Sequence, residues 1–183
     1  MQLSNGKILG ISFGVGLLGA LIFASTTSQT KTMYNRLFTN VYGGKEFLSN
    51  EVRGLRNNNP GNIRISKDNW KGKVPQSLNT DGQFEQFISY PYGVRALIKL
   101  IQTYYYKYNC TSIKSIISRF APINENNTKG YINNVAKSLG VGISDNITLN
   151  NRTIKILVIA IDKVENGKRT ITEKHYQEAL NLL

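Results

Sequence analysis

The sequence has few residues of the kinds that form disulfides or bind transition metals. Its 183 residues include one cysteine, Cys110, and one histidine, His175. A single cysteine excludes an internal disulfide framework, and one cysteine with one histidine cannot assemble a His/Cys metal site. A Ser-His-Asp triad would have to use His175, which lies in a lysine-flanked amphipathic stretch typical of a surface. We therefore expect no bound metal and no cofactor.

Acidic residues are also scarce, with 11 Asp and Glu against 23 Lys and Arg, which gives a net charge of +12. Residues 45–183 alone carry 20 basic and 11 acidic residues. This part should therefore associate with polyanions such as nucleic acid, anionic lipid or acidic cell-wall polymer. A basic surface that only aids solubility is the alternative. The chain lacks dense basic runs and any known DNA-reading motif, which weakens a nucleic-acid function.

Charge is absent from Ile8 to Ala24, "ILGISFGVGLLGALIFA". As a helix these residues would rise roughly 26 Å, so residues 1–24 predict one N-terminal transmembrane helix that anchors the protein. A secretory signal peptide is the alternative, but its basic region would be thin and no clean A-x-A cleavage site follows. The few flanking charges leave the orientation undecided. Residues 25–44 indicate a polar linker.

From residue 45 onward, apolar residues recur mostly at helical spacing. They predict helices over 92–108, 111–120, 128–140, 150–167 and 172–183. Residues 57–90 differ, because they combine prolines, glycines and the alternating stretch "FEQF" at 84–87, in which Glu85 should point away from the two phenylalanines. These features predict a small two- or three-stranded lobe. The expected fold class is α+β, a mainly helical domain over 45–183 with a minor β-lobe.

Six short motifs occur in an order that resembles a family of phage and prophage proteins carrying R-G-I-R-N-N-N-P-G-N-I-R. They are "RGLRNNNPGNIR" (53–64), "WKG" (70–72), "DGQFEQF" (81–87), "GVRA" (93–96), "APINENNT" (121–128) and "ENG" (165–167). Members are labelled virion structural proteins or lytic enzymes, and they resemble lytic transglycosylases and bacterial glucosaminidases. The resemblance implies a lysozyme-like domain that cleaves peptidoglycan glycan strands. The E-S-G-W-G helix end and the G-L-M-Q strand of those enzymes have no counterpart here.

Glycan cleavage needs a carboxylic acid that protonates the glycosidic oxygen, and Glu165 is the first candidate. It ends an apolar helix directly before Asn166-Gly167. The negative pole of a helix and apolar neighbours both favour the protonated form of a carboxyl group. A solvated residue paired with Lys168 or Arg169 is the alternative.

Three further acidic residues are candidates for the site. Glu51 precedes the asparagine turn, and Arg53 and Arg56 suit it to stabilising a positive charge. Asp81 matches an aspartate of the resembled family and would serve as the second carboxylate or order a turn. Glu125 either caps the helix that follows it or contacts substrate.

The asparagines raise a question of their own. Asparagine tolerates turn conformations, and its amide both donates and accepts. Asn58, Asn59 and Asn62 would lock a turn and also present amides to N-acetyl groups and sugar hydroxyls, or else only satisfy backbone groups. The strand ending at Arg64 resembles the "NN-x-x-G-I-K" strand of the glucosaminidases, which places Arg64 among the candidate substrate contacts. Trp70 would stack on a sugar ring or fill the core.

Together these features predict a phage virion-associated, peptidoglycan-degrading enzyme. It would sit in a virion membrane through a single span, act at the host cell envelope and associate with other virion proteins. The alternative is a non-catalytic structural protein of the virion membrane whose basic domain contacts DNA or capsid.

Overall fold

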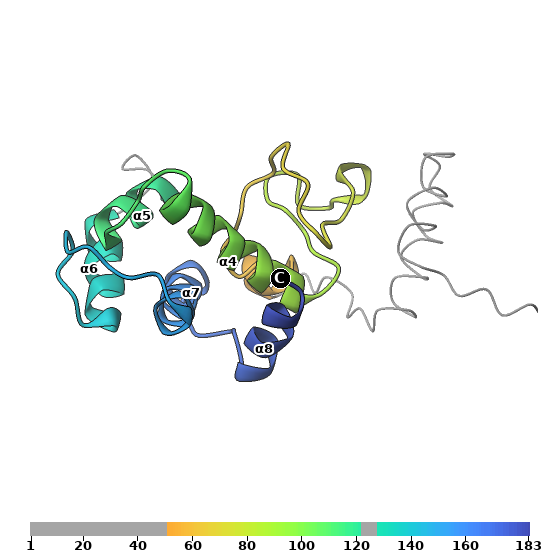
Figure 1. Cartoon of the computed structure of the whole chain (residues 1–183). Coiled ribbons are helices and arrows are strands. Elements are labelled where there is room, and N and C mark those ends of the chain that lie inside the picture. The colour runs from red at the N-terminus through yellow and green to blue at the C-terminus, as the bar shows by residue number, and fades with distance from the viewer. Residues whose placement is uncertain (1–50, 122–127) are drawn as a thin grey trace, which may run out of the picture. The chain divides into compact units, whose positions relative to one another are not determined.

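Helices make up the regular secondary structure of the part that the structure describes, which is residues 51–121 and 128–183 of a computed structural model (Figure 1). In chain order the elements are α3 (Arg53–Arg56), the 3-10 turn η1 (Gln76–Leu78), α4 (Tyr90–Tyr106), α5 (Ile113–Phe120), α6 (Thr128–Leu139), α7 (Asn151–Asn166) and α8 (Glu173–Asn181). Each of the five longer helices begins and ends within two residues of its predicted range.

The ends of these helices follow from local side-chain chemistry. Ser112 and Thr172 form capping boxes at the starts of α5 and α8, and Asn150 accepts a hydrogen bond from the Thr153 amide at 2.9 Å at the start of α7. Such caps satisfy amides that a helix leaves unpaired. Gly167, with a φ of 69°, ends α7 in the left-handed conformation that glycine adopts most readily. The main chain therefore turns directly after Glu165 and Asn166.

Helix α4 lies at the centre of the helical body and packs against α5, α7 and α8 (Figure 1). Helix α6 packs against α5 and α7, and α3 packs against α7. The largest fully buried apolar side chains include Leu97, Ile98, Ile101, Ile116, Ile117, Leu157 and Ile161. Burying side chains of this size stabilises a fold by about 1.5–3 kcal/mol each. This core fixes α7 and its C-terminal end against α4.

The predicted β-lobe is wrong for the described residues, because the structure has no strand there. Residues 57–89 contain only two isolated antiparallel bridges, Arg64 with Phe84 and Lys73 with Phe87. Side-chain amides bind main-chain groups that a ladder would have paired; Asn59, for example, donates to the carbonyls of Ile63 and Glu85. The described part is therefore helical, with an irregular segment between α3 and α4.

The described part of the chain, residues 51–121 and 128–183, contains no helix that is long and apolar enough to span a membrane. The predicted anchor over residues 1–24 and the linker over 25–44 lie outside the described residues.

Gly93 is where α4 meets the asparagine turn. A Cβ atom at this position would lie 1.8 Å from the Asn58 carbonyl oxygen. Because that oxygen belongs to the backbone, it cannot rotate away. The contact requires glycine and brings the turn directly onto the helix.

We expect Gly93→Ala to lower the free energy of unfolding by about 3 kcal/mol, since relieving the clash must separate α4 from the turn. Urea unfolding of the full chain measures this. Tyr106→Ala, an exposed position on the same helix, should change the value by less than about 0.5 kcal/mol. Equal stability of the two variants would contradict the close contact.

Candidate functional site

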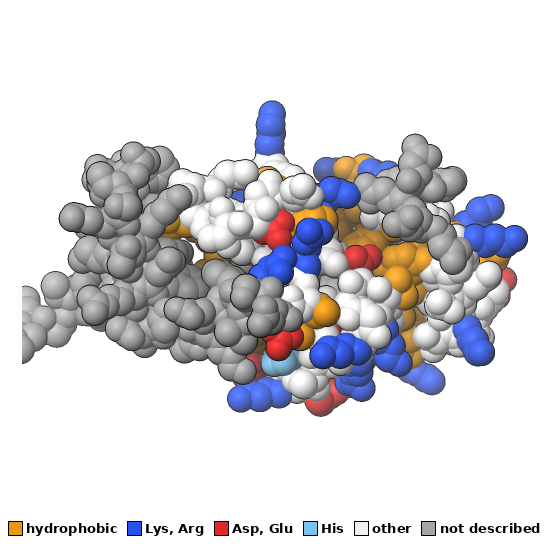
Figure 2. All heavy atoms as spheres, turned by 180° about the vertical axis from the view of Figure 1, so that it is seen from behind, with side chains coloured by type: hydrophobic (Ala, Val, Ile, Leu, Met, Phe, Trp, Pro, Cys, Tyr) orange, Lys and Arg blue, Asp and Glu red, His pale blue; other side chains and the backbone are white. Residues whose placement is uncertain are grey.

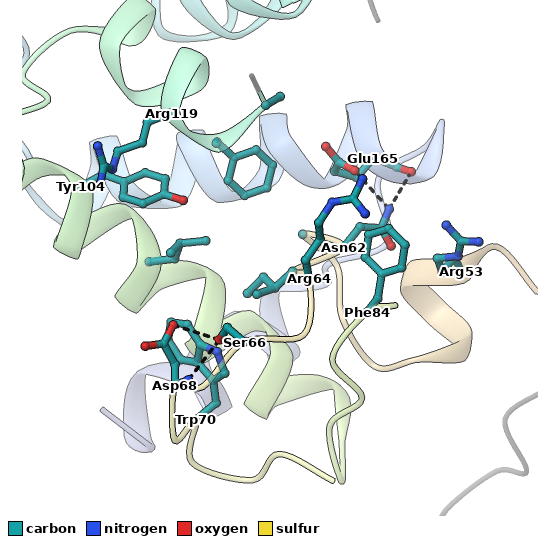
Figure 3. Close-up of a pocket in the computed structure, with 15 residues that line it drawn as sticks. Arg53, Asn62, Arg64, Ser66, Asp68, Trp70, Phe84, Tyr104, Arg119 and Glu165 are labelled. Carbon is teal, nitrogen blue, oxygen red and sulfur yellow. Dashed lines mark hydrogen bonds between the residues drawn. The ribbon is translucent and has the colours of Figure 1, made fainter. Parts of the chain in front are cut away.

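A cleft of about 580 Å³ opens between the asparagine turn, α4, α5 and the C-terminal end of α7. Figure 3 draws its lining residues, with Glu165, Asn62 and Arg53 toward one end and Trp70, Asp68, Tyr104 and Arg119 toward the other. Of the nine predicted site residues, Asn62, Arg64, Trp70 and Glu165 line this cleft.

The asparagine turn is held by its own amides. Asn59 is fully buried, and its side chain donates to the Ile63 and Glu85 carbonyls at 3.0 and 2.9 Å and accepts from the Ile63 amide at 2.9 Å. Asn58, with a φ of 52°, donates to the Phe87 carbonyl at 2.9 Å. Both amides are therefore occupied by the backbone, and neither residue lines the cleft. Their role in this structure is to hold the turn.

Hydrogen bonds of Asn166 connect the asparagine turn to the C-terminal end of α7. Asn166 donates to the Pro60 carbonyl at 2.9 Å and to the Asp162 carboxylate at 3.0 Å. A Cβ atom on Gly54 would lie 2.0 Å from the Asn166 Oδ1 atom, so α3 also approaches closely here. Fully buried Asp162 accepts from the Thr170 and Ile171 amides as well. The motifs "NNNPGN" and "ENG", about 100 residues apart, thus form one interlocked unit.

Glu165 is half-buried at the C-terminal end of α7, and its carboxyl group is held from two sides (Figure 3). The Asn62 Nδ2 atom donates to Glu165 Oε2 at 3.1 Å. The Tyr131 hydroxyl, from α6, donates to Glu165 Oε1 at 3.3 Å. Asn62 has a φ of 43°, a left-handed conformation that asparagine tolerates better than most residues. The two donors fix the orientation of the carboxyl group at the cleft wall.

The Tyr131 hydroxyl keeps its proton near neutral pH and so can donate it in a hydrogen bond. Burial raises the pKa of the Tyr131 phenol, and the negative charge of Glu165 and its hydrogen bond raise it further. The phenol therefore keeps its proton. The predicted helix pattern placed Tyr131 on an apolar face, and nothing in its spacing indicated a contact with Glu165.

Two arginines and a phenylalanine form the wall beside Glu165. The guanidinium carbons of Arg53 and Arg64 lie 4.6 and 5.1 Å from the centre of the Phe84 ring. Cations over an aromatic face attract it electrostatically. Arg64 is exposed and lines the cleft.

At the other end of the cleft, half-buried Trp70 packs against the cluster of Ile63, Phe87 and Ala96. Its indole nitrogen is buried and has no hydrogen-bond partner among the described residues. Asp68 accepts a hydrogen bond from the Ser66 hydroxyl at 3.0 Å. Sequence reasoning did not select Asp68, Tyr104 or Arg119, because their convergence depends on how α4 and α5 pack.

Two of the other predicted acids, Glu51 and Asp81, lie away from the cleft. Glu51 is exposed and Asp81 is packed behind the turn, and neither lines the cleft. Asp81 accepts from Asn57 at 2.8 Å and lies 3.5 Å from the Arg53 Nε atom. Glu125 lies outside the described residues. Within the described ranges no group of three or more His, Cys, Asp and Glu side chains could hold a metal ion.

The hydrogen bonds around Asp81 predict a pH-dependent stability. Burial raises the pKa of this carboxyl group, but hydrogen bonds from Asn57 and the backbone of Phe84 and Gln83, with the charge of Arg53, outweigh burial and hold the pKa below its ordinary value of 3.8. Since the folded-state pKa is lowered, the charged group contributes stability above pH 3.8, and this contribution is lost as the pH falls through the folded-state pKa.

We expect Asp81→Asn to reduce the free energy of unfolding near neutral pH by about 1 kcal/mol. The difference from wild type should shrink as the pH falls from about 4 to 2. Urea unfolding across this range measures it, with Glu178→Gln, an exposed partner of Lys174, as the control. A difference that stays constant with pH would contradict the role of the charge.

Comparison with known proteins adds a phage relative. No family model matches the chain. Protein P5 of Pseudoalteromonas phage PM2 is 40% identical over 128 residues, which cover 68% of this chain and 78% of that protein. The chain therefore belongs to the family of phage PM2 protein P5.

Proposed function

We propose that the protein is a virion-associated enzyme that cleaves the glycan strands of peptidoglycan during phage entry, with Glu165 as the general acid. The observation that carries the proposal is the Glu165 carboxyl group, oriented by Asn62 and Tyr131 at the wall of a cleft of about 580 Å³. A cleft of this size accommodates a few sugar rings.

The chemistry requires two proton transfers at Glu165, one away from its carboxyl group and one back to it. Glu165 donates its proton to the glycosidic oxygen, the bond from this oxygen to C1 breaks, and positive charge develops at C1. The Glu165 carboxylate then takes a proton from the nucleophile that attacks C1. That nucleophile is the C6 hydroxyl of the same sugar in a lytic transglycosylase, or water in a hydrolase.

Among the described residues, Glu165 is the one carboxylate at its end of the cleft, since Asp68 lies toward the other end (Figure 3). A retaining or inverting hydrolase needs a second carboxylate near the scissile bond. The transglycosylase route is the form of the proposal that uses Glu165 alone, first as acid and then as base. The acetamido group of the substrate would stabilise the charge at C1.

Membership in a phage protein family supports a role in the phage particle. Arg64 and Trp70, which line the cleft, supply a cation and an aromatic face for sugars. Peptidoglycan is the proposed substrate, and other virion proteins are the proposed partners.

A non-catalytic structural role is the second candidate, and the charge of the protein favours it. Figure 2 shows Lys and Arg side chains spread over the face that it draws, with fewer Asp and Glu, and the whole chain carries +12. Such a surface would bind DNA through its phosphates, with an affinity that falls steeply with salt.

Incubation of the purified full chain with peptidoglycan sacculi distinguishes these candidates. A fall in turbidity with release of soluble glycan fragments supports the enzyme. Sacculi that stay intact, together with salt-sensitive retention of double-stranded DNA, would overturn it in favour of the structural role.

A further inference from the structure

A second groove, of about 780 Å³, adjoins the Glu165 cleft. The two share Asp68, Trp70, Leu100, Tyr104 and Arg119. A polymer lying in the cleft would therefore continue into this groove. We call it the basic groove, because five of its lining residues are cationic and one, Asp68, is acidic. The cations are Lys71, Arg95, Lys99, Lys107 and Arg119.

Three of these cations are already engaged. Lys71 Nζ and Arg95 Nε both donate to the Leu182 carbonyl oxygen, at 2.9 and 3.0 Å. The Arg119 guanidinium stacks on Tyr108 at 3.5 Å from the ring centre, and it lies 5.4 Å from that of Tyr104. Stacking leaves the edge of a guanidinium able to donate hydrogen bonds.

Lys99 and Lys107 are less constrained than these three. Lys99 is half-buried on α4, and Lys107 is exposed directly after the helix, with its Nζ atom 5.7 Å from the centre of the Tyr108 ring. Neither forms an ion pair with another described residue. Two such cations that line one groove suit a ligand that carries separated negative charges.

We propose that the basic groove binds the carboxylates of the peptide branches on the glycan strand that Glu165 cuts. The inference rests on the proposed function and names a recognition element for its substrate. Peptide branches of peptidoglycan carry free carboxylates, whereas the sugar backbone between them is largely uncharged. A neutral backbone passes the Glu165 carboxyl group without repulsion while its branches reach the lysines.

A nucleic-acid strand fits the same surface less well. Its phosphates repeat at every nucleotide, so a strand that followed the groove into the cleft would meet the exposed Asp68 carboxylate as well as the cations Arg119, Arg64 and Arg53. Like charges repel one another, so Asp68 interrupts the path that a row of phosphates would follow. The arrangement of charges therefore favours a polymer whose anionic groups are branches.

The single tryptophan of the chain, Trp70, lines both cavities and reports binding by its fluorescence. The full chain in a mild detergent, carrying Glu165→Gln to prevent turnover, is titrated with soluble glycan fragments that keep their peptides and with matched fragments stripped of peptides by an amidase. The test variant adds Lys99→Glu and Lys107→Glu. The control adds Lys114→Glu and Lys137→Glu, two exposed lysines that line neither cavity.

We expect the test variant to bind peptide-bearing fragments about tenfold more weakly, with binding of stripped fragments changed less than twofold. The control should match the parent on both. Equal weakening on both fragments, or none on either, would overturn the inference. Tighter binding of a single-stranded oligonucleotide, lost in the test variant, would also overturn it and assign the groove to nucleic acid.

Cleavage of sacculi by the chain with native Glu165 is measured separately, so the two claims can fail independently. Peptide-dependent binding without cleavage would support the binding role of the basic groove and contradict the proposed enzymatic activity. Cleavage with peptide-independent binding would support the enzymatic activity and contradict the binding role of the groove.

Discussion

Glu165→Gln is expected to reduce the release of soluble glycan from sacculi by about 10³-fold, the range that a general acid contributes. Glutamine has the shape of glutamate but no transferable proton. It keeps an oxygen that can accept from Asn62 or Tyr131, so the folded state should lose only about 1 kcal/mol. Initial rates of turbidity loss, with unfolding curves for both proteins, measure the two effects together.

Asp68→Asn is the matched control, because it makes the same carboxyl-to-amide change toward the other end of the cleft (Figure 3). We expect it to keep at least about a tenth of the wild-type rate, since a residue that only contacts substrate contributes less than the acid. A folded Glu165→Gln variant with wild-type rates would show that another group supplies the proton.

Asn59→Ala should have the largest effect on stability, lowering the free energy of unfolding by about 4 kcal/mol. The substitution removes three hydrogen bonds to buried main-chain groups of Ile63 and Glu85, and each buried group left unpaired costs about 1–3 kcal/mol. Asn69→Ala, an exposed asparagine of the same segment, should change it by less than about 0.5 kcal/mol. Urea unfolding of the two variants gives the comparison.

Asn59→Asp separates loss of hydrogen bonds from loss of volume, because it keeps the shape of the side chain. Its carboxylate would face the Ile63 and Glu85 carbonyl oxygens, to which Asn59 now donates. This contact disfavours the charged form, so the variant should become less stable as the pH rises above about 4. If Asn59→Asp were as stable as wild type at every pH, the role assigned to this amide would be contradicted.

The helices could be predicted from the sequence because their signals are local. Apolar residues recur at helical spacing, and residues such as Asn150 and Gly167 mark the ends. The position of Glu165, at the end of an apolar helix that a glycine terminates, could be predicted for the same reason. Its nearness to the asparagine turn depends on long-range contacts such as the hydrogen bond from Asn166 to Pro60, which no local pattern shows.

The β-lobe was predicted wrongly because the alternation of apolar and polar residues was interpreted as a strand with one exposed face. In "FEQF" all four side chains are buried. Glu85, expected to point away from the phenylalanines, is 1% exposed and pairs with Lys73 at 3.1 Å. Gln86 donates to Asn57 at 3.0 Å. Polar residues with buried partners look like surface residues in a sequence, since the partners lie far along the chain.

The contacts of the Tyr131 hydroxyl and the Asn62 amide with Glu165 could not be predicted for a related reason. Tyr131 satisfies an apolar helical pattern, and its bond to Glu165 exists only because α6 packs against α7. Asn62 belonged to a set of asparagines of which three, at 57, 58 and 59, serve the backbone or the interior. The hydrogen bond from Asn166 to the Pro60 carbonyl holds the turn against α7, and the Asn62 amide then lies beside Glu165.

Mass spectrometry of the material released from sacculi tests the central claim most directly, because it identifies the bond that is broken. If Glu165 transfers the proton, full-length protein should release disaccharide-peptides with 1,6-anhydro ends, and Glu165→Gln should release none. Fragments with intact glycan and cut peptide bonds, or the same anhydro products from Glu165→Gln, would contradict the account.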